Sequence, residues 1–234
     1  MSQLNKFLSW IGGAFSVFYK DLRLEVRNKS VLGTLLIFVL STLILFLFAT
    51  GRNDIGPRVQ SGLLWMIILF NAALGLGRTF LVEEERGTGI FLRMNTQAGM
   101  VYLGKLLFSF LIILLTNIIS TGLFVFLSNS VVALPGLFVL SIFLGTIGLA
   151  GATTLLSAII ARTARSGPLL PMLLFPLLIP LLLSAVESTY FSLAGQPFAV
   201  DGWNAASGSL IVMVSFSGVV IASSVLLFDY VWNE

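Results

Sequence analysis

The sequence predicts an all-α integral membrane protein with six transmembrane helices, preceded by an amphipathic helix at the membrane interface. Of the 234 residues, 57% are hydrophobic and only 10% are charged, whereas a soluble domain usually carries about 25% charged residues on its hydrated surface. The charged residues also gather in clusters, which leaves long uncharged runs between them. Helices are favoured over a β-barrel because these runs are continuously apolar, whereas a lipid-facing strand alternates apolar and polar residues.

Six uncharged runs are long enough to cross a bilayer, whose hydrocarbon core of about 30 Å needs roughly 20 helical residues. The third and fourth runs share one uncharged stretch, which the segment SNSVVALPG divides because small polar residues, Pro and Gly favour a turn. The predicted spans comprise residues 31–50, 59–77, 106–127, 137–161, 168–186 and 205–228. Since the connectors are short and no repeat is recognisable, residues 1–234 are predicted to form a single transmembrane domain.

Residues 2–29 are too charged to span a membrane, yet their apolar side chains are ordered. At about 100° per residue, these side chains fall within about a third of the helix circumference, and Lys6, Lys20 and Arg27 lie on the opposite side. The apolar side chains are Leu4, Phe7, Leu8, Ile11, Phe15, Phe18, Leu22 and Val26. The pattern predicts an amphipathic helix in the cytoplasmic interface. A cleaved signal peptide does not fit, because the first apolar run comes late and has the length of a full span.

The basic residues indicate the orientation of the chain. Eleven of the 13 Lys and Arg residues precede the first span or lie in the second and fourth connectors, and the other two lie in the first connector. Lys and Arg gather on the cytoplasmic side of membrane proteins, so both termini are predicted to be cytoplasmic. The same placement explains the net charge of +3, and no nucleic-acid partner is expected.

Several kinds of chemistry are excluded. The chain has no Cys and no His, so no disulfide, zinc site or His-based catalysis can come from it, and no metal site is predicted. The stretch GLGRT is not a phosphate-binding loop, because Ala72 and Arg78 stand where that motif needs Gly and Lys. No predicted span carries a charge that could relay protons. We therefore expect no catalytic residues and no enzymatic activity, with ATP hydrolysis, if any, supplied by a separate partner subunit.

The polar and proline residues within the spans allow two interpretations. Asn71, Asn117 and Thr154 are examples of polar residues that either form interhelical hydrogen bonds or line a translocation surface. Pro176 and Pro180 in the fifth span each delete a backbone hydrogen bond and bend the helix. Because freed carbonyls need partners in lipid, this helix is expected to pack against others or to line a cavity, as a gate or as an ordinary kinked helix.

The stretch RTFLVEEERGTG, Arg78 to Gly89, holds five ionisable side chains in twelve residues. It opens the connector between the second and third spans and predicts a short helix, followed by an apolar turn through residues 90–92. The stretch is either a solvated connector or a docking element. The apolar turn favours docking to a soluble partner, since a plain solvated loop has no need of it.

Three stretches resemble a known family. They are LLWMIILFNAALGLGRTFLVEEERGTG, followed by YLGKLLFSF, and RSGPLLPMLLFPLLIP in the fifth span. Together with the amphipathic helix and the six spans, they resemble ABC-2 type exporter permeases, and more specifically the haem exporter protein B (CcmB) family of cytochrome c maturation. The resemblance covers most of the chain.

The resemblance implies an ABC-2 exporter-like permease domain in the bacterial cytoplasmic (inner) membrane. Its function would be that of the permease subunit of an ABC transporter complex in cytochrome c-type biogenesis, for haem export or for ATP-driven release of a haem-loaded chaperone. Lys105 would anchor the start of the third span at the interface, and Pro176 and Pro180 would shape the fifth helix. The residues that would couple to an ATPase are Arg78, Phe80, Glu83, Glu84, Glu85, Arg86 and Gly87.

The resemblance also implies partners. These are a cytoplasmic ABC ATPase that binds ATP, a Trp-rich haem-handling membrane protein, a small single-span subunit and a second copy of the chain. Because the chain could offer haem iron only Met or Tyr, haem is expected to be handled by the partner, with no cofactor bound here. Two alternatives stay open: an ABC-2 permease for a lipid, polysaccharide or drug, and an assembly scaffold that transports nothing.

Overall fold

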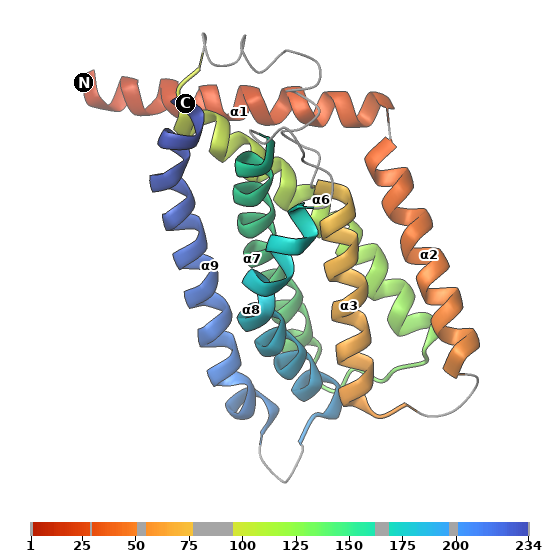
Figure 1. Ribbon diagram of the computed structural model, residues 1–234. Coiled ribbons are helices and arrows are strands. Elements are labelled where there is room, and N and C mark those ends of the chain that lie inside the picture. The colour runs from red at the N-terminus through yellow and green to blue at the C-terminus, as the bar shows by residue number, and fades with distance from the viewer. Residues whose placement is uncertain are drawn as a thin grey trace.

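The computed structural model describes residues 2–28, 30–50, 55–76, 96–161, 169–196 and 201–233. In these residues the protein consists of seven α-helices and their connections, without strands (Figure 1). The helices are α1 (Ser2–Asn28), α2 (Ser30–Thr50), α3 (Pro57–Leu76), α6 (Ala98–Leu127), α7 (Pro135–Ala161), α8 (Leu169–Ala194) and α9 (Gly202–Asn233). The all-α prediction is therefore confirmed for the described part of the chain.

Helix α1 lies across one end of a bundle that the other helices form, as Figure 1 shows. The N- and C-terminal ends of the chain are both at this end. Helices α7, α8 and α9 pack against one another, α3 packs on α8, and α6 packs on both α7 and α1. Helix α2 lies at the edge of the bundle, against α3 and α6.

Four of the described helices are long and apolar enough to cross a membrane, which supports a multi-pass membrane protein. The four segments are Ala98–Leu127, Pro135–Ala161, Met172–Ala194 and Gly202–Phe228. The apolar part of α2, Gly33–Ala49, is shorter. Spanning by α2 and α3 therefore stays a prediction, although both coincide closely with predicted spans.

Helices α6 and α8 each extend by eight residues beyond one predicted end. Helix α6 begins at Ala98, so the last turns of the predicted connector are helical and Lys105 lies inside the helix. Helix α8 continues past residue 186 to Ala194, and the Ser209 hydroxyl donates a 2.9 Å hydrogen bond to Glu187 on this added part. Gly195 then adopts a φ of +76°, a left-handed conformation that ends helices and that side chains rarely adopt.

Helix α7 lies at the centre because its small residues let neighbouring helices approach closely. A Cβ at Gly145 would overlap the ring of Trp65 on α3, with its Cζ3 atom only 2.7 Å away. A Cβ at Gly148 would lie 2.7 Å from Leu181 on α8. The Trp65 indole is buried and donates a 2.8 Å hydrogen bond to Thr189 on α8. This one side chain therefore joins α3, α7 and α8.

Candidate functional site

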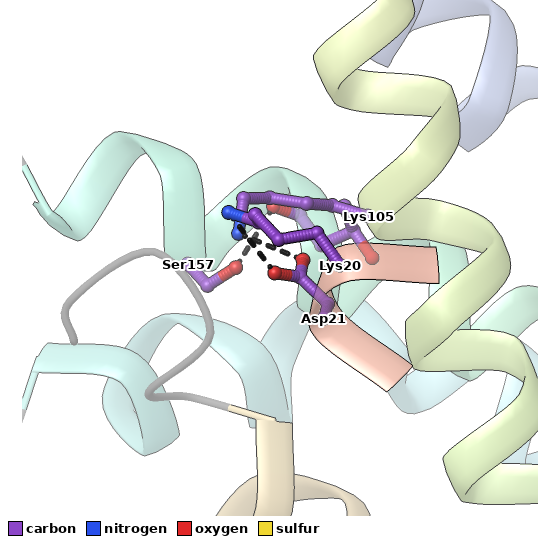
Figure 2. A network of polar contacts seen from close by, with 5 residues as sticks. Lys20, Asp21, Lys105 and Ser157 are labelled. Carbon is purple, nitrogen blue, oxygen red and sulfur yellow. Dashed lines mark hydrogen bonds and ion pairs between the residues drawn. The ribbon is translucent and has the colours of Figure 1, made fainter. Parts of the chain in front are cut away.

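A buried ion pair joins α1 to α6. Lys105 on α6 is only 1% exposed, and its Nζ lies 3.2 Å from Oδ2 of Asp21 on α1. Lys20, which is partly exposed, places its Nζ 3.2 Å from the other carboxylate oxygen of Asp21. Figure 2 shows Ser157 of α7 beside these three side chains. The cluster of Lys20, Asp21, Lys105 and Ser157, which we call the junction, thus brings together three helices.

Gly104 lets α1 reach this position. A Cβ at residue 104 would lie 2.6 Å from the carbonyl oxygen of Ala14 and 2.8 Å from Cβ of Val17. Any larger residue would therefore push the α1 backbone away from α6 and would carry Asp21 out of reach of Lys105. The Gly-Lys pair in the stretch YLGKLLFSF now has a physical explanation, since the glycine admits α1 and the lysine pairs with it.

The electrostatics of the junction require that its charges be paired. Removing an ammonium and a carboxylate from water costs several kcal/mol each, and their attraction offsets this cost only in close contact, about 3 Å here. Lys105 belongs to a helix that is apolar enough to span a membrane, where an unpaired charge is especially unfavourable. The pair therefore holds α1 against α6 as well as neutralising Lys105.

The face of α1 that packs on α6 is not its apolar face. The buried residues Ala14, Val17, Asp21 and Glu25 recur at helical spacing along one side of α1. By contrast, apolar residues of the predicted interfacial face, such as Phe15 and Val26, are more than half exposed. The amphipathic segment is confirmed as a helix. Phe18 and Leu22 of its predicted apolar face are partly buried against the bundle, whereas Phe15 and Val26 are not covered by the described residues, and its position in the membrane interface stays a prediction.

Among the described residues, three interhelical hydrogen bonds join fully buried polar side chains of the bundle, besides the partly buried bond from Ser209 to Glu187. Asn117 of α6 donates to Thr146 of α7 at 3.0 Å, in addition to the bond from Trp65 to Thr189. The hydroxyls of Ser141 on α7 and Ser188 on α8 lie 2.6 Å apart. Thr116, Ser120, Thr121 and Thr153 instead donate to carbonyl oxygens of their own helices. The interhelical interpretation is therefore confirmed at the first three places and does not extend to these four residues.

Asn71 on α3 differs from the hydrogen-bonded polar residues described above. It is 1% exposed, and neither its Nδ2 nor its Oδ1 has a hydrogen-bond partner among the described residues. Ser109 and Thr154 likewise have hydroxyls without such a partner. A buried amide without hydrogen-bond partners destabilises the folded state. At Asn117 this cost is offset in part by the hydrogen bond to Thr146, whereas at Asn71 the described residues offer no such bond.

We expect Asn71→Leu to raise the thermal unfolding midpoint of the purified protein, with a gain of about 1 kcal/mol or more in unfolding free energy. Leucine has a similar size and removes the amide that lacks partners. The matched variant Asn117→Leu should not share the gain, because it also removes the bond to Thr146. A lower midpoint for Asn71→Leu than for the wild type would show that the amide is bonded in the protein under the conditions of the measurement.

Pro176 and Pro180 both lie inside α8, which is helical through both positions. The buried face of α8 carries Leu174 and Leu178, whereas both prolines are exposed. Met172, whose carbonyl loses its helical partner to Pro176, is 72% exposed. The expectation of helix packing therefore holds for one face of α8, while the described residues do not cover the face with the prolines. The shaping role of these prolines stays a prediction.

The predicted coupling residues, Arg78, Phe80, Glu83, Glu84, Glu85, Arg86 and Gly87, lie outside the described residues. Their role stays a prediction, as does the anchoring role of Lys105 at an interface. The structure does place Lys105 within α6 and against α1, rather than at a helix end. In the described residues, no three acidic side chains come together as metal ligands would.

Sequence reasoning missed Asp21 as a partner of Lys105. A signal was present, because Asp21 continues the spacing of Ala14 and Val17 on one side of α1. An acidic residue on the same side as small apolar residues is unusual for a solvated face. What the pattern does not reveal is which cation this acidic residue meets, 84 positions further along the chain.

The chain is similar to known proteins along most of its length. Residues 13–226 match the family model described as "CcmB protein". A "Heme exporter protein B" of Rhodobacter capsulatus is 29% identical over 170 residues, which covers 72% of this chain and 78% of the relative. A protein of the same description from Bradyrhizobium diazoefficiens is 27% identical over 190 residues, or 77% of this chain and 85% of the relative. The chain therefore belongs to the CcmB protein family.

Proposed function

We propose that this chain is the membrane permease subunit of a haem export system that serves cytochrome c-type biogenesis. The observation that carries the proposal is the family match over residues 13–226, together with two relatives described as "Heme exporter protein B". Four described helices that are long and apolar enough to cross a membrane fit a transporter component.

The proposed topology has six spans, with α2 and α3 added to the four longer helices. The junction end of the bundle would face the cytoplasm of a bacterium, in its inner membrane. Two observations support this orientation: the bias of Lys and Arg towards the connectors of one side, and the position of both chain ends beside α1 (Figure 1). Arg58, at the start of α3, would lie on the opposite, periplasmic side.

The proposed mechanism separates chemistry from movement. This chain has no His or Cys, so axial ligation of haem would belong to a Trp-rich membrane partner, and ATP would bind to a cytoplasmic ABC ATPase. A small single-span subunit and a second copy of this chain would complete the complex. The permease would transmit the ATP-driven change across the membrane, either to export haem or to release a haem-loaded chaperone.

The experiment that tests this function is purification of the tagged chain in a mild detergent, followed by mass spectrometry of the proteins that accompany it. We expect an ATP-binding subunit and a Trp-rich haem protein, and we expect deletion of the chain to abolish haem-stained c-type cytochromes in cells. An ATPase without the haem protein would favour a permease for another substrate, such as a lipid, polysaccharide or drug. A complete complex whose ATPase activity is the same with and without this chain would favour an assembly scaffold.

Arg78→Glu should leave the complex assembled but reduce the stimulated ATPase activity, meaning the activity of the complex above that of the isolated ATPase subunit. The physical reason is that a charge reversal at the proposed contact replaces attraction by repulsion, a change of about 1–3 kcal/mol in coupling between the subunits. The measurement is ATP hydrolysis by the purified complex, alongside its subunit composition.

Arg58→Glu is the matched control, because it makes the same charge change at the opposite end of the bundle. Arg58 is exposed there and lies 5.5 Å above the ring of Tyr190. This control should leave the ATPase activity unchanged. Normal ATPase activity in an assembled Arg78→Glu complex would contradict the coupling role of Arg78.

A further inference from the structure

The contact between α1 and α6 is concentrated on the first turns of α6. Trp10 of α1 lies against Gly99, and Gly13 lies against Met100. The Gly104 contact and the junction follow along the same side of α6. Along the chain, α6 is the next described helix after the segment that is proposed to contact the ATPase, and it begins 11 positions after Gly87, the last residue of that segment. Helix α1 therefore holds the part of α6 that any movement of this segment reaches first.

Two features make this contact rigid. The ion pair is buried, with Asp21 and Lys105 at 8% and 1% exposure, so separating the helices would take the Asp21 carboxylate away from the Lys105 ammonium at a poorly solvated site, while Asp21 would keep Lys20 of its own helix. Because residue 104 is glycine, the α1 backbone packs directly against α6. Such close packing resists small displacements of one helix relative to the other. Ser157 of α7, the most buried of the spanning helices, lies beside the charged groups of the junction (Figure 2).

We propose that Asp21, Lys105 and Gly104 clamp α1 to α6, and that the two helices move as one rigid unit during the transport cycle. The clamp rests on the proposed function, since it transmits the displacement of the coupling segment. A force on the segment before α6 then acts on α1 and α6 together and reaches α7 through the junction. Without the clamp, the first turns of α6 would bend or slide under α1, and the movement would be lost before it reached the bundle.

A reversible cross-link tests whether the two helices separate. The chain has no cysteine, so an introduced pair is the only one in this subunit. In Met100→Cys, the Sγ atom takes the position of the Met100 Cγ. A Cβ at residue 13 would lie 3.5 Å from that position, and this separation suits a disulfide. We expect the Gly13→Cys/Met100→Cys complex to retain its stimulated ATPase activity and its cytochrome c yield when the disulfide is formed.

The same pair tests whether the clamp is needed. Asp21→Asn alone should assemble and lose about tenfold in stimulated ATPase activity, within the usual range of coupling free energies. Adding the cysteine pair to Asp21→Asn should restore the activity when oxidised and lose it again on reduction. Asp21→Asn without cysteines, treated with the same oxidant and reductant, controls for effects on other subunits. Because a disulfide also stabilises the fold, the unfolding midpoint and subunit composition are measured in both states, and the activity should follow the disulfide while the complex stays assembled throughout.

Either of two results would overturn the clamp. Loss of activity on oxidation in the otherwise unchanged chain would show that α1 must leave α6 during the cycle. Equal activity of the Asp21→Asn variant with the cysteine pair in its oxidised and reduced states would show that the contact transmits nothing. Both results require a wild-type complex with stimulated ATPase activity. They are therefore distinct from failure of the proposed function, in which no ATPase co-purifies with the wild-type chain.

Discussion

Gly145→Ala will destabilise the bundle by about 2–4 kcal/mol, because it forces the buried Trp65 ring out of its position. The new Cβ would overlap the indole, and the ring has no free space on α7 to move into, since its neighbours there are buried as well. Displacing the ring also strains the hydrogen bond from its Nε1 to Thr189. The added methyl group therefore has two costs, the steric overlap with the indole and the strained hydrogen bond. Helices α3, α7 and α8 also lose their common contact through Trp65.

The measurement is the unfolding midpoint in one detergent, followed through tryptophan fluorescence. Gly122→Ala is the matched control, because a Cβ at Gly122 of α6 has no atom of another helix within 4 Å. The control should be as stable as the wild type or more stable, since alanine is better in a helix than glycine by about 1 kcal/mol. A Gly145→Ala midpoint equal to that of the control would contradict the packing of Trp65 on Gly145.

A double variant separates the steric cause from a backbone cause. Trp65→Phe removes the larger ring, so Gly145→Ala should cost less in this background than in the wild type, by about 1 kcal/mol or more. If both substitutions simply add, the cost of Gly145→Ala does not come from contact with Trp65.

The positions of the helices could be predicted because the hydrophobic pattern determines them almost alone. A run of about 20 apolar residues is long enough for a helix to cross the hydrocarbon core of a bilayer, and in a chain with so few charges it predicts a transmembrane helix. Helices α7 and α9 accordingly lie close to the predicted residues 137–161 and 205–228. The amphipathic α1 follows in the same way from the spacing of its apolar residues.

The boundary at α6 could not be predicted in this way. A charge is costly in an apolar helix, so Lys105 indicates the limit of a span when the sequence alone is considered. The structure removes that cost with Asp21, a residue of a distant helix. Likewise, the sequence does not reveal that Trp65 lies against Gly145. Nor does it reveal that Asn117 bonds to Thr146 while Asn71 has no hydrogen-bond partner among the described residues. These features depend on how helices pack side by side, which periodicity along one helix does not determine.

The two ends of the ion pair should differ in their effect on stability, and this difference is the second large effect that the structure predicts. Asp21→Asn removes the carboxylate that faces the buried Lys105 ammonium, and breaking such a pair from one side costs about 3–5 kcal/mol. Lys105→Gln should cost less, because Asp21 keeps the ammonium of Lys20 at 3.2 Å. Lys20→Gln should cost least, about 1 kcal/mol or less, since Lys20 is partly exposed and its ion pair is screened by water.

The order of the three midpoints in one detergent checks this prediction, and the exposure of each group explains the order. Lys105 is 1% exposed and cannot turn towards water, whereas Lys20, with 37% of its side chain exposed, can. Raising the salt concentration should reduce the small effect of Lys20→Gln but leave that of Asp21→Asn nearly unchanged, because salt screens exposed pairs far more than buried ones. Equal effects of all three substitutions would mean that the junction is open to solvent. It would then hold α1 by apolar contact alone, and Gly104, rather than the ion pair, would determine where α1 lies.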